Sequence, residues 1–155
     1  MLSIYSLVSP KCIYINPDVK SKEELLHMMV NGISSELGIA DSELLYDAVM
    51  KREKMSVTSL GFGCAVPHAL TAAVEKTSIC AAVIKKGIDY TAPDEQPVSI
   101  VLMMIGPESG ARIHLKLLSR IARFLHNEDF RNQLKQTETS DDFLRIIKNE
   151  EEKCL

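Results

Sequence analysis

The stretch Val98-Ser-Ile-Val-Leu-Met-Met-Ile105 is apolar at all but one position, and it indicates how the rest of the chain is arranged. Its length is that of a strand, well short of the roughly 18 apolar residues that a membrane-spanning helix requires. A strand that is apolar without alternation usually lies in the middle of a sheet whose two faces are covered by helices. This stretch therefore predicts a central strand in a layered fold.

Shorter apolar stretches predict the other strands. Ile79–Ile84 is one of them, and it ends at the polar sequence Lys85–Gly87. Residues 4–8 and 12–16 are rich in β-branched or aromatic side chains and flank Pro10, a residue that is tolerated at the edge of a sheet. We expect one or two edge strands there.

Apolar side chains at helical spacing mark the segments outside these strands. Ser21 and Glu24 form a capping box at the start of the first such segment, and Gly38 follows its end. Helices that alternate with strands predict an α/β fold, a mixed (about five-stranded) β-sheet with helices on both faces. The other predicted helices run from Asp41 to about Lys54, from about Ile113 to Leu125, near 127–136 with Asn127 as cap, and near 140–150 with Ser140 as cap.

Length and composition narrow the classes of protein that fit. The chain has 155 residues, the size of one compact domain, and we expect residues 1–155 to form a single domain. Its 46% hydrophobic and 25% charged residues exclude a disordered chain, a collagen and a simple coiled coil. A net charge of −3 and only 5% aromatic residues argue against nucleic acid as a partner and against direct membrane insertion.

The cysteines bear on where the protein acts. Cys12, Cys64, Cys80 and Cys154 form no C-x-x-C pair, and their spacing fits neither a disulfide framework nor a zinc ribbon. Free thiols are typical of a reducing cytoplasm. The N-terminal stretch also lacks the leading positive charges of a secretory signal, so we expect a cytoplasmic protein.

Among the four histidines, His68 has the most distinctive surroundings. It directly follows Val66 and Pro67, and Gly61 and Gly63 precede these. A residue before proline is pushed towards an extended conformation, while proline fixes its own φ and offers no N–H. This stiff segment would present the imidazole in one orientation. A nucleophilic histidine needs that presentation and must be neutral near pH 7.

The run Arg52–His68, REKMSVTSLGFGCAVPH, resembles the active-site region of the fructose/mannitol/nitrogen-type IIA domains of the bacterial phosphoenolpyruvate-dependent phosphotransferase system. The resemblance covers nearly the whole chain and is strongest over 50–130. It implies that His68 accepts a phosphoryl group from the phosphocarrier HPr and passes it to a IIB domain for sugar uptake. It also implies that His114 is a second active-site histidine and that Arg52 neutralises the phosphate.

General chemistry agrees with these implied roles. Phosphoryl transfer needs in-line positioning and neutralisation of the equatorial oxygens, and the planar guanidinium of Arg52 suits a phosphate. The Thr58 hydroxyl is a candidate donor to the phosphate, the alternative being a turn hydroxyl bonded to its own backbone. Because the group would travel from nitrogen to nitrogen without a nucleotide, we expect no metal and no cofactor.

Two further expectations concern the surroundings of the site. Phe62, Ala65 and Leu70 are candidates for an apolar surface that contacts partner proteins. Glu53 is expected to be a surface charge or an ion-pair partner of Arg52.

Other interpretations of the same residues remain open. In a regulatory nitrogen-type IIA protein, the phosphorylation state of His68 would control binding to target proteins. Ala69 and Phe62 depart from the family pattern, which is compatible with a homologue that only binds. A zinc site made of Cys64, His68 and His114 would lack a defined geometry, and a Cys64–His68 nucleophile pair would lack an orienting residue.

Overall fold

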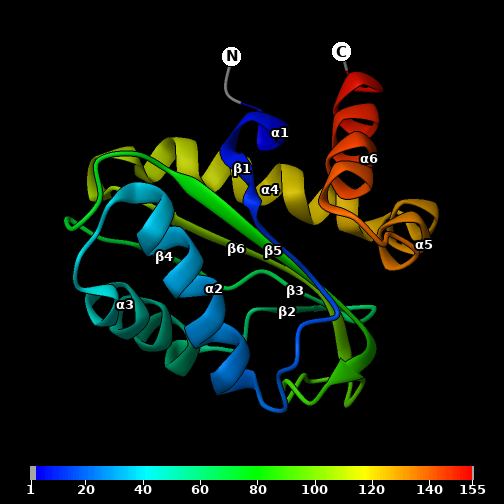
Figure 1. Ribbon diagram of the computed structural model, residues 1–155, viewed down its shortest axis with the longest axis horizontal. Helices are drawn as coiled ribbons and strands as arrows, with labels where there is room; N and C mark the ends of the chain where they lie inside the picture. The colour runs from blue at the N-terminus through cyan, green and yellow to red at the C-terminus, as the bar shows by residue number, and fades with distance from the viewer. Residues whose placement is uncertain (1–2, 155) are drawn as a thin grey trace.

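The computed structural model describes residues 3–154, and in it six strands form one mixed sheet with helices packed against it (Figure 1). The elements in chain order are α1 (Ile4–Leu7), β1 (Val8–Ile15), α2 (Lys22–Leu37), α3 (Ser42–Met55), β2 (Ser59–Gly61), β3 (Cys64–Ala65), β4 (His68–Leu70), β5 (Ser78–Ile88), β6 (Val98–Gly106), the 3-10 turn η1 (Glu108–Gly110), α4 (Ala111–His126), α5 (Glu128–Lys135) and α6 (Ser140–Glu152).

The strand predicted to be central is central. Every residue of β6 is buried, and β6 pairs with β5 on one side and with β3 and β4 on the other. The sheet order is β1-β5-β6-β3-β2, with β4 also on β6. β5 runs antiparallel to β6, whereas β3 and β4 run parallel to it, so the predicted mixed sheet is confirmed.

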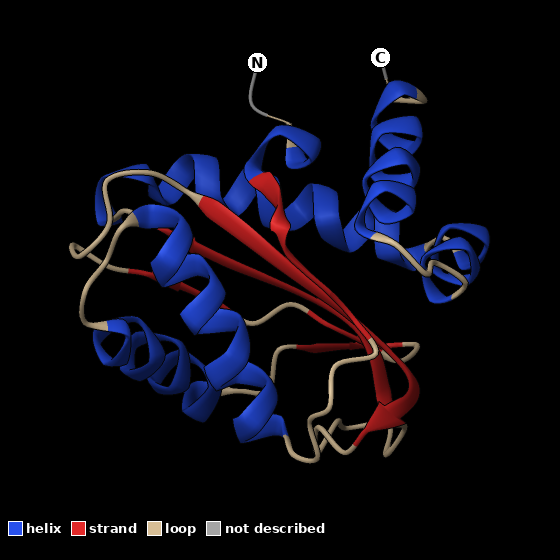
Figure 2. Cartoon of the chain, viewed as in Figure 1, coloured by secondary structure: helices blue, strands red, loops and turns tan. Residues whose placement is uncertain are grey.

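Helices cover both faces of this sheet, as predicted (Figure 2). Leu102 and Met104 of β6 belong to the core cluster that α4, α5 and α6 complete. Val101 and Met103 belong to the cluster that α2 and α3 complete. Burying one such side chain fully contributes roughly 1.5–3 kcal/mol to stability. A polar residue at any of these positions of β6 would therefore destabilise one of the two cores. The nearly continuous apolar sequence of β6 thus reflects two cores.

The helix ends follow the predicted caps with one exception. The side chains of Ser21, Asp41 and Asn127 accept hydrogen bonds from the first turns of α2, α3 and α5, as predicted. Thr139 caps α6, so the prediction that Ser140 does so was wrong by one residue. Thr139 has the extended backbone of a cap, which lets its hydroxyl oxygen reach a free N–H of the first turn.

The N-terminal strand prediction was wrong for residues 4–7. Ile4–Leu7 form a helical turn, and β1 begins only at Val8 and continues to Ile15 at the edge of the sheet. The N–H groups of Ile4 and Tyr5 donate to the Glu151 carboxylate of α6 at 2.9 and 2.7 Å. The negative charge at the start of this turn favours the helical conformation.

The predicted end of the second strand was also wrong. β5 continues through Lys85–Gly87 to Ile88, and its register with β6 shifts between Val83 and Ile88. Gly87 has a φ of 75°, which favours glycine. A bulge that includes a glycine therefore carries the strand through the polar sequence.

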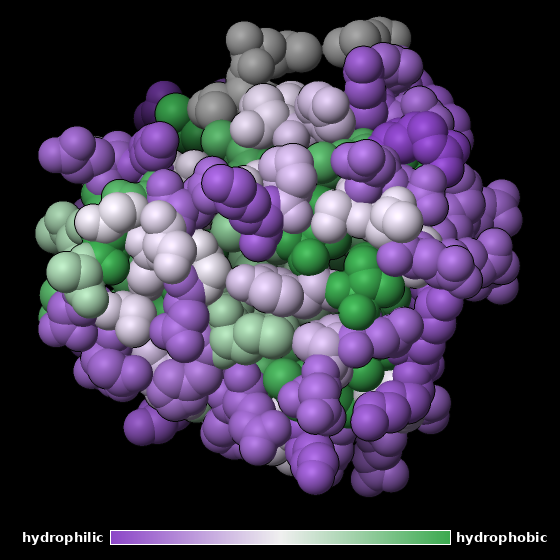
Figure 3. All heavy atoms as spheres, viewed as in Figure 1, coloured by the Kyte–Doolittle hydropathy of each residue, from purple (hydrophilic) through white to green (hydrophobic). Residues whose placement is uncertain are grey.

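Within residues 3–154, no helix is long and apolar enough to cross a membrane. Figure 3 shows small hydrophobic patches between hydrophilic side chains on the face that Figure 1 presents. The buried apolar side chains belong to the two core clusters between the helices and the sheet.

We predict that Glu151→Ala lowers the free energy of unfolding by about 1–3 kcal/mol, because hydrogen bonds to a charged group are lost at two backbone donors. Urea denaturation measures this loss. Glu152→Ala is the matched control, since its side chain is exposed and changes there usually stay within about 0.5 kcal/mol. Equal stability of the two variants would contradict the role given to Glu151.

Candidate active site

His68 stands at a break between two short strands that share one neighbour. β3 and β4 both pair with β6, and Pro67 interrupts them because it lacks an N–H. The Pro67 carbonyl still accepts from the Met104 N–H at 3.0 Å, which keeps the broken segment on the sheet. His68 begins β4 opposite Met104 and is half-buried.

A backbone hydrogen bond orients the His68 ring. Nδ1 lies 2.8 Å from the Val66 carbonyl oxygen, which can only accept, so Nδ1 carries the proton and Nε2 carries the free lone pair. Burial lowers the pKa of His68 most strongly, and Arg52 lowers it further, against opposing effects of the Val66 carbonyl and of Glu53. The ring is therefore neutral at pH 7, and Nε2 is available as a nucleophile.

His114 lies beside it on the second turn of α4. The two ring centroids are 5.5 Å apart, and only 4% of His114 is exposed. Within residues 3–154, neither of its ring nitrogens has a hydrogen-bond partner. Burial, and then the neighbouring His68, lower the pKa of His114 to about 4. It is a neutral polar group that lacks a partner at the wall of a cavity.

Gly106 makes room for this imidazole. A Cβ at Gly106 would lie 3.3 Å from His114 Nδ1 and 2.9 Å from Thr77 Oγ1. The second distance is shorter than side chains tolerate, so any larger residue would displace one of the two groups. The end of β6 thus sets the position of His114.

Arg52 completes the group that the sequence predicts. It lies in the last turn of α3, and its Nη1 donates to the Ser56 carbonyl at 3.1 Å. A cavity of about 490 Å³, called here the histidine cavity, is lined by Arg52, His68 and His114 together. A second cavity of about 310 Å³ is lined by Arg52 and His68 but not by His114. The structure therefore brings all three predicted residues together.

Sequence reasoning missed several residues of the histidine cavity. Lys51 lines it beside Arg52 and adds a second positive charge. Met55 and Leu115 also line it, with 77% and 65% of their surfaces exposed. The Lys51-Arg52 pair near the end of a helix was a visible signal, whereas Leu115 could be found only once α4 was placed.

Two residues of the predicted partner surface lie elsewhere. Ala65 is fully buried in the core on the α2 side. Phe62 lies in the turn between β2 and β3, where its ring meets the edge of His126 and the Arg131 guanidinium stands 4.5 Å from the ring centre. His126 ends α4, the helix that carries His114 near its other end. Of the three predicted apolar residues, only Leu70 borders the histidine cavity.

The expectation for Glu53 was wrong, because its carboxylate is buried rather than exposed. Only 6% of Glu53 is accessible, and it pairs with Lys22 at 3.0 Å instead of with Arg52. The buried Thr58 hydroxyl donates to this carboxylate. Its single proton is therefore engaged, and the geometry does not favour direct donation to a phosphate.

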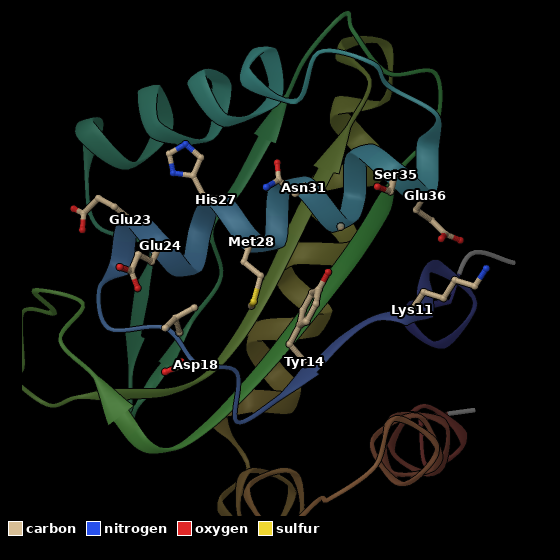
Figure 4. Close-up of a pocket in the computed structure, with 12 residues that line it drawn as sticks. Lys11, Tyr14, Asp18, Glu23, Glu24, His27, Met28, Asn31, Ser35 and Glu36 are labelled. Atoms are coloured by element: carbon tan, nitrogen blue, oxygen red, sulfur yellow. The ribbon is translucent and has the colours of Figure 1, made fainter.

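A cavity larger than the histidine cavity lies in a different place. A groove of about 960 Å³ runs between α2 and β1, and Figure 4 shows side chains from both elements pointing towards it. Asp18, Glu23, Glu24 and Glu36 line it, against one lysine, Lys11. These carboxylates would repel a phosphoryl group, so charge, and not size, favours the histidine cavity.

The alternatives that involve Cys64 find no support in the geometry. Burial raises the pKa of the Cys64 thiol to about 11, so it is not a thiolate at neutral pH. All four cysteines are free. Within residues 3–154, no three His, Cys, Asp or Glu side chains are grouped so that they could hold a metal ion.

Comparison with known proteins points to one family. Residues 6–150 match the family described as phosphoenolpyruvate-dependent sugar phosphotransferase system, EIIA 2. The fructose-specific EIIABC component of Bacillus subtilis is 34% identical over 94% of the chain, which spans only 23% of that relative's length. A nitrogen regulatory protein of Bradyrhizobium diazoefficiens is 32% identical over 86% of the chain and 87% of its own length.

The fold also matches solved structures. The nitrogen regulatory protein IIA-Ntr from Neisseria meningitidis superposes with a TM-score of 0.88 at 24% identity, over 93% of this chain and 98% of that one. At this identity the likeness concerns the fold alone. It agrees with the sheet order and the helix positions described above.

We predict that acid destabilises the protein through His114. Its pKa is about 4 in the folded chain, against about 6.5 for an unfolded histidine. Between these values the unfolded chain binds more protons, so the stability present above about pH 6.5 is lost as the pH falls towards about 4. The pKa difference corresponds to roughly 3 kcal/mol.

Urea denaturation across this pH range measures the effect. We expect His114→Gln to flatten the pH dependence of the free energy of unfolding, and the exposed His126, changed to Gln, to leave it as in the wild type. An unchanged slope in His114→Gln would show that the burial of this imidazole does not control the acid response.

Proposed function

Because the chain belongs to the phosphoenolpyruvate-dependent sugar phosphotransferase system EIIA 2 family, whose domains are phosphotransferases that carry phosphoryl groups on histidine, we propose that it is a phosphocarrier. It accepts a phosphoryl group on His68 from HPr and passes it to a IIB domain for sugar uptake. One observation carries this proposal for His68: its Nδ1 is held by the Val66 carbonyl, which leaves Nε2 free beside Arg52 and His114.

The phosphoryl transfer requires no proton from a group other than the two imidazole rings. The lone pair of His68 Nε2 attacks the phosphorus atom of the donor phosphohistidine, and the donor N–P bond breaks with its electron pair returning to the donor ring. His68 keeps its proton on Nδ1, so its ring gains a positive charge as the donor ring loses one. The Val66 carbonyl, 2.8 Å from Nδ1, stabilises that charge. The reverse sequence delivers the group to the next partner.

The other proposed site residues act on the phosphoryl oxygens or on the positions of the groups around them. Arg52 is half-buried at the cavity and would offset the negative charge of the phosphoryl group. His114 is neutral and has no hydrogen-bond partner among the described residues, so it can donate one hydrogen bond to a phosphoryl oxygen. The Thr58 hydroxyl already donates to Glu53, so Thr58 supports the site through Glu53 and does not contact the phosphoryl group.

The partner surface in this proposal is the exposed apolar rim of the histidine cavity. Met55, Leu70 and Leu115 form it, and Lys51 adds a positive charge that suits a phosphorylated partner. Residues 1–155 act as a single IIA-type domain in this proposal, and the free thiols suit the cytoplasm, where HPr would meet it.

A regulatory role is the second candidate. The identities to the fructose-specific relative and to the nitrogen regulatory protein are nearly equal, 34% and 32%. In this case the phosphorylation of His68 would control binding to target proteins at the same rim. About two negative charges are added on phosphorylation, enough to change which partner binds.

We predict that His68→Ala abolishes labelling by radioactive phosphoenolpyruvate in the presence of enzyme I and HPr, because Nε2 of this residue is the proposed acceptor. His126→Ala is the control, since His126 lies at the opposite end of α4 from the cavity, and it should label fully. Label that persists in His68→Ala would rule out this residue as the acceptor. Transfer of the label from the wild type to a IIB domain distinguishes the transport role from the regulatory one.

We predict that Arg52→Gln slows the acceptance of phosphate by roughly 10- to 100-fold, because a hydrogen bond to a charged group is worth about 1.5–3 kcal/mol. Quench-flow measurement of labelling by phosphorylated HPr gives this rate. Lys54→Gln removes an exposed charge of the same helix turn outside the cavity and should label at the wild-type rate. Equal rates in the two variants would show that Arg52 is a bystander.

A further inference from the structure

We infer that Glu53 is a positioning residue for the phosphoryl-transfer site, because separate chains of contacts lead from its buried carboxylate to His68 and to Arg52. This inference rests on the proposed function for its effect on rate. The geometry that it describes can be tested on the unphosphorylated protein alone.

Glu53 is surrounded by donors from three separate segments of the chain. Its carboxylate accepts from Lys22 Nζ at 3.0 Å, from the Tyr90 hydroxyl at 3.1 Å and from the Thr58 hydroxyl. These partners come from α2, from the segment after β5 and from the segment after α3. A buried carboxylate is costly unless it is paired and hydrogen-bonded, and here both conditions are met. The carboxylate is thereby held in one position.

The first chain of contacts leads to His68. Thr58 is bound to Glu53 through its hydroxyl, and its N–H lies 3.5 Å from the same carboxylate. The Thr58 carbonyl accepts from the Val66 N–H at 3.0 Å, and the Val66 carbonyl holds His68 Nδ1 at 2.8 Å. Only two residues, Thr58 and Val66, separate the buried carboxylate from the imidazole. A shift of Thr58 therefore moves the carbonyl that sets the His68 tautomer.

The second chain leads to Arg52. The hydrogen bond between Thr58 and Glu53 closes a short segment of the chain, and Ser56 lies within this segment. Ser56 follows the last residue of α3 and has an extended backbone. Its carbonyl accepts from Arg52 Nη1 at 3.1 Å. Because the bond between Glu53 and Thr58 fixes both ends of this segment, it also fixes the direction of the Ser56 carbonyl. The guanidinium is then held at the cavity before phosphate arrives, which reduces the cost of ordering it.

Thr58→Val is the sharpest test, because it removes one hydroxyl from the network and leaves the charges of Glu53 and Lys22 in place. Thr58→Ser is the conservative variant that keeps the hydroxyl. Thr137→Val is the matched control: Thr137 is equally buried, between α5 and α6, and its hydroxyl donates to the Leu134 carbonyl at 2.6 Å. Both valine variants therefore remove one buried hydroxyl donor.

The first readout is the ¹H–¹⁵N NMR signal of His68 in the unphosphorylated protein. In the wild type we expect a protected Nδ1–H resonance from a single tautomer. In Thr58→Val we expect this resonance to broaden and the tautomers to mix, because the Val66 carbonyl is no longer held. Thr58→Ser and Thr137→Val should retain the wild-type spectrum.

The second readout is labelling by phosphorylated HPr. We expect Thr58→Val to lower kcat by about 10- to 100-fold, as small misplacements of reacting groups do, with KM within about twofold because the partner surface is untouched. Thr58→Ser should restore kcat, and Thr137→Val should keep the wild-type value despite a similar loss of stability.

The inference is overturned if Thr58→Val folds and shows the wild-type His68 spectrum, since Glu53 would then serve stability alone. Should Thr58→Val fail to fold, Tyr90→Phe replaces it, because it also removes one donor from Glu53 without changing a charge, and the same two readouts decide. A wild type that takes no label at all would defeat the proposed function, while the spectrum would still test the positioning.

Discussion

The hydrogen bond from His68 Nδ1 to the Val66 carbonyl connects the backbone of the sheet to the chemistry of the site. It forms across Pro67, which has no N–H of its own and a fixed φ, so the backbone on either side has little freedom to turn away. The bond leaves Nε2 as the nitrogen with a free lone pair. Burial keeps the ring neutral, and a neutral imidazole with a free Nε2 is what phosphoryl acceptance requires.

β6 is the common support of both histidines. Its residue Met104 pairs with His68, and its last residue, Gly106, lies against the ring of His114. A strand buried on both faces is among the most rigid parts of a protein, because each residue packs on two sides. The distance between the two imidazoles is therefore set by the sheet and by the first turns of α4, rather than by a mobile loop.

Charged groups around the site have different tasks because they are buried to different degrees. Arg52 remains partly exposed at the histidine cavity, whereas the neighbouring Glu53 points inward and binds Lys22, Thr58 and Tyr90. Adjacent residues on a helix point about 100° apart, so one can face the cavity while the next faces the core. The sequence pair Arg52-Glu53 suggests a surface ion pair, but the helix separates the two side chains.

The alternation of helices and strands, the central strand, the main helix caps and the stiff segment that presents His68 were accessible from the sequence, because each depends on local patterns: an apolar run, a cap residue, a proline before a histidine. Resemblance to a family added Arg52 and His114. Only the tertiary structure decided that Phe62 lies away from the cavity, that Glu53 is buried and that Leu115 borders the site. Those outcomes depend on which helix face and which turn meet across the sheet. Such contacts join residues far apart in the chain, so no local pattern carries them.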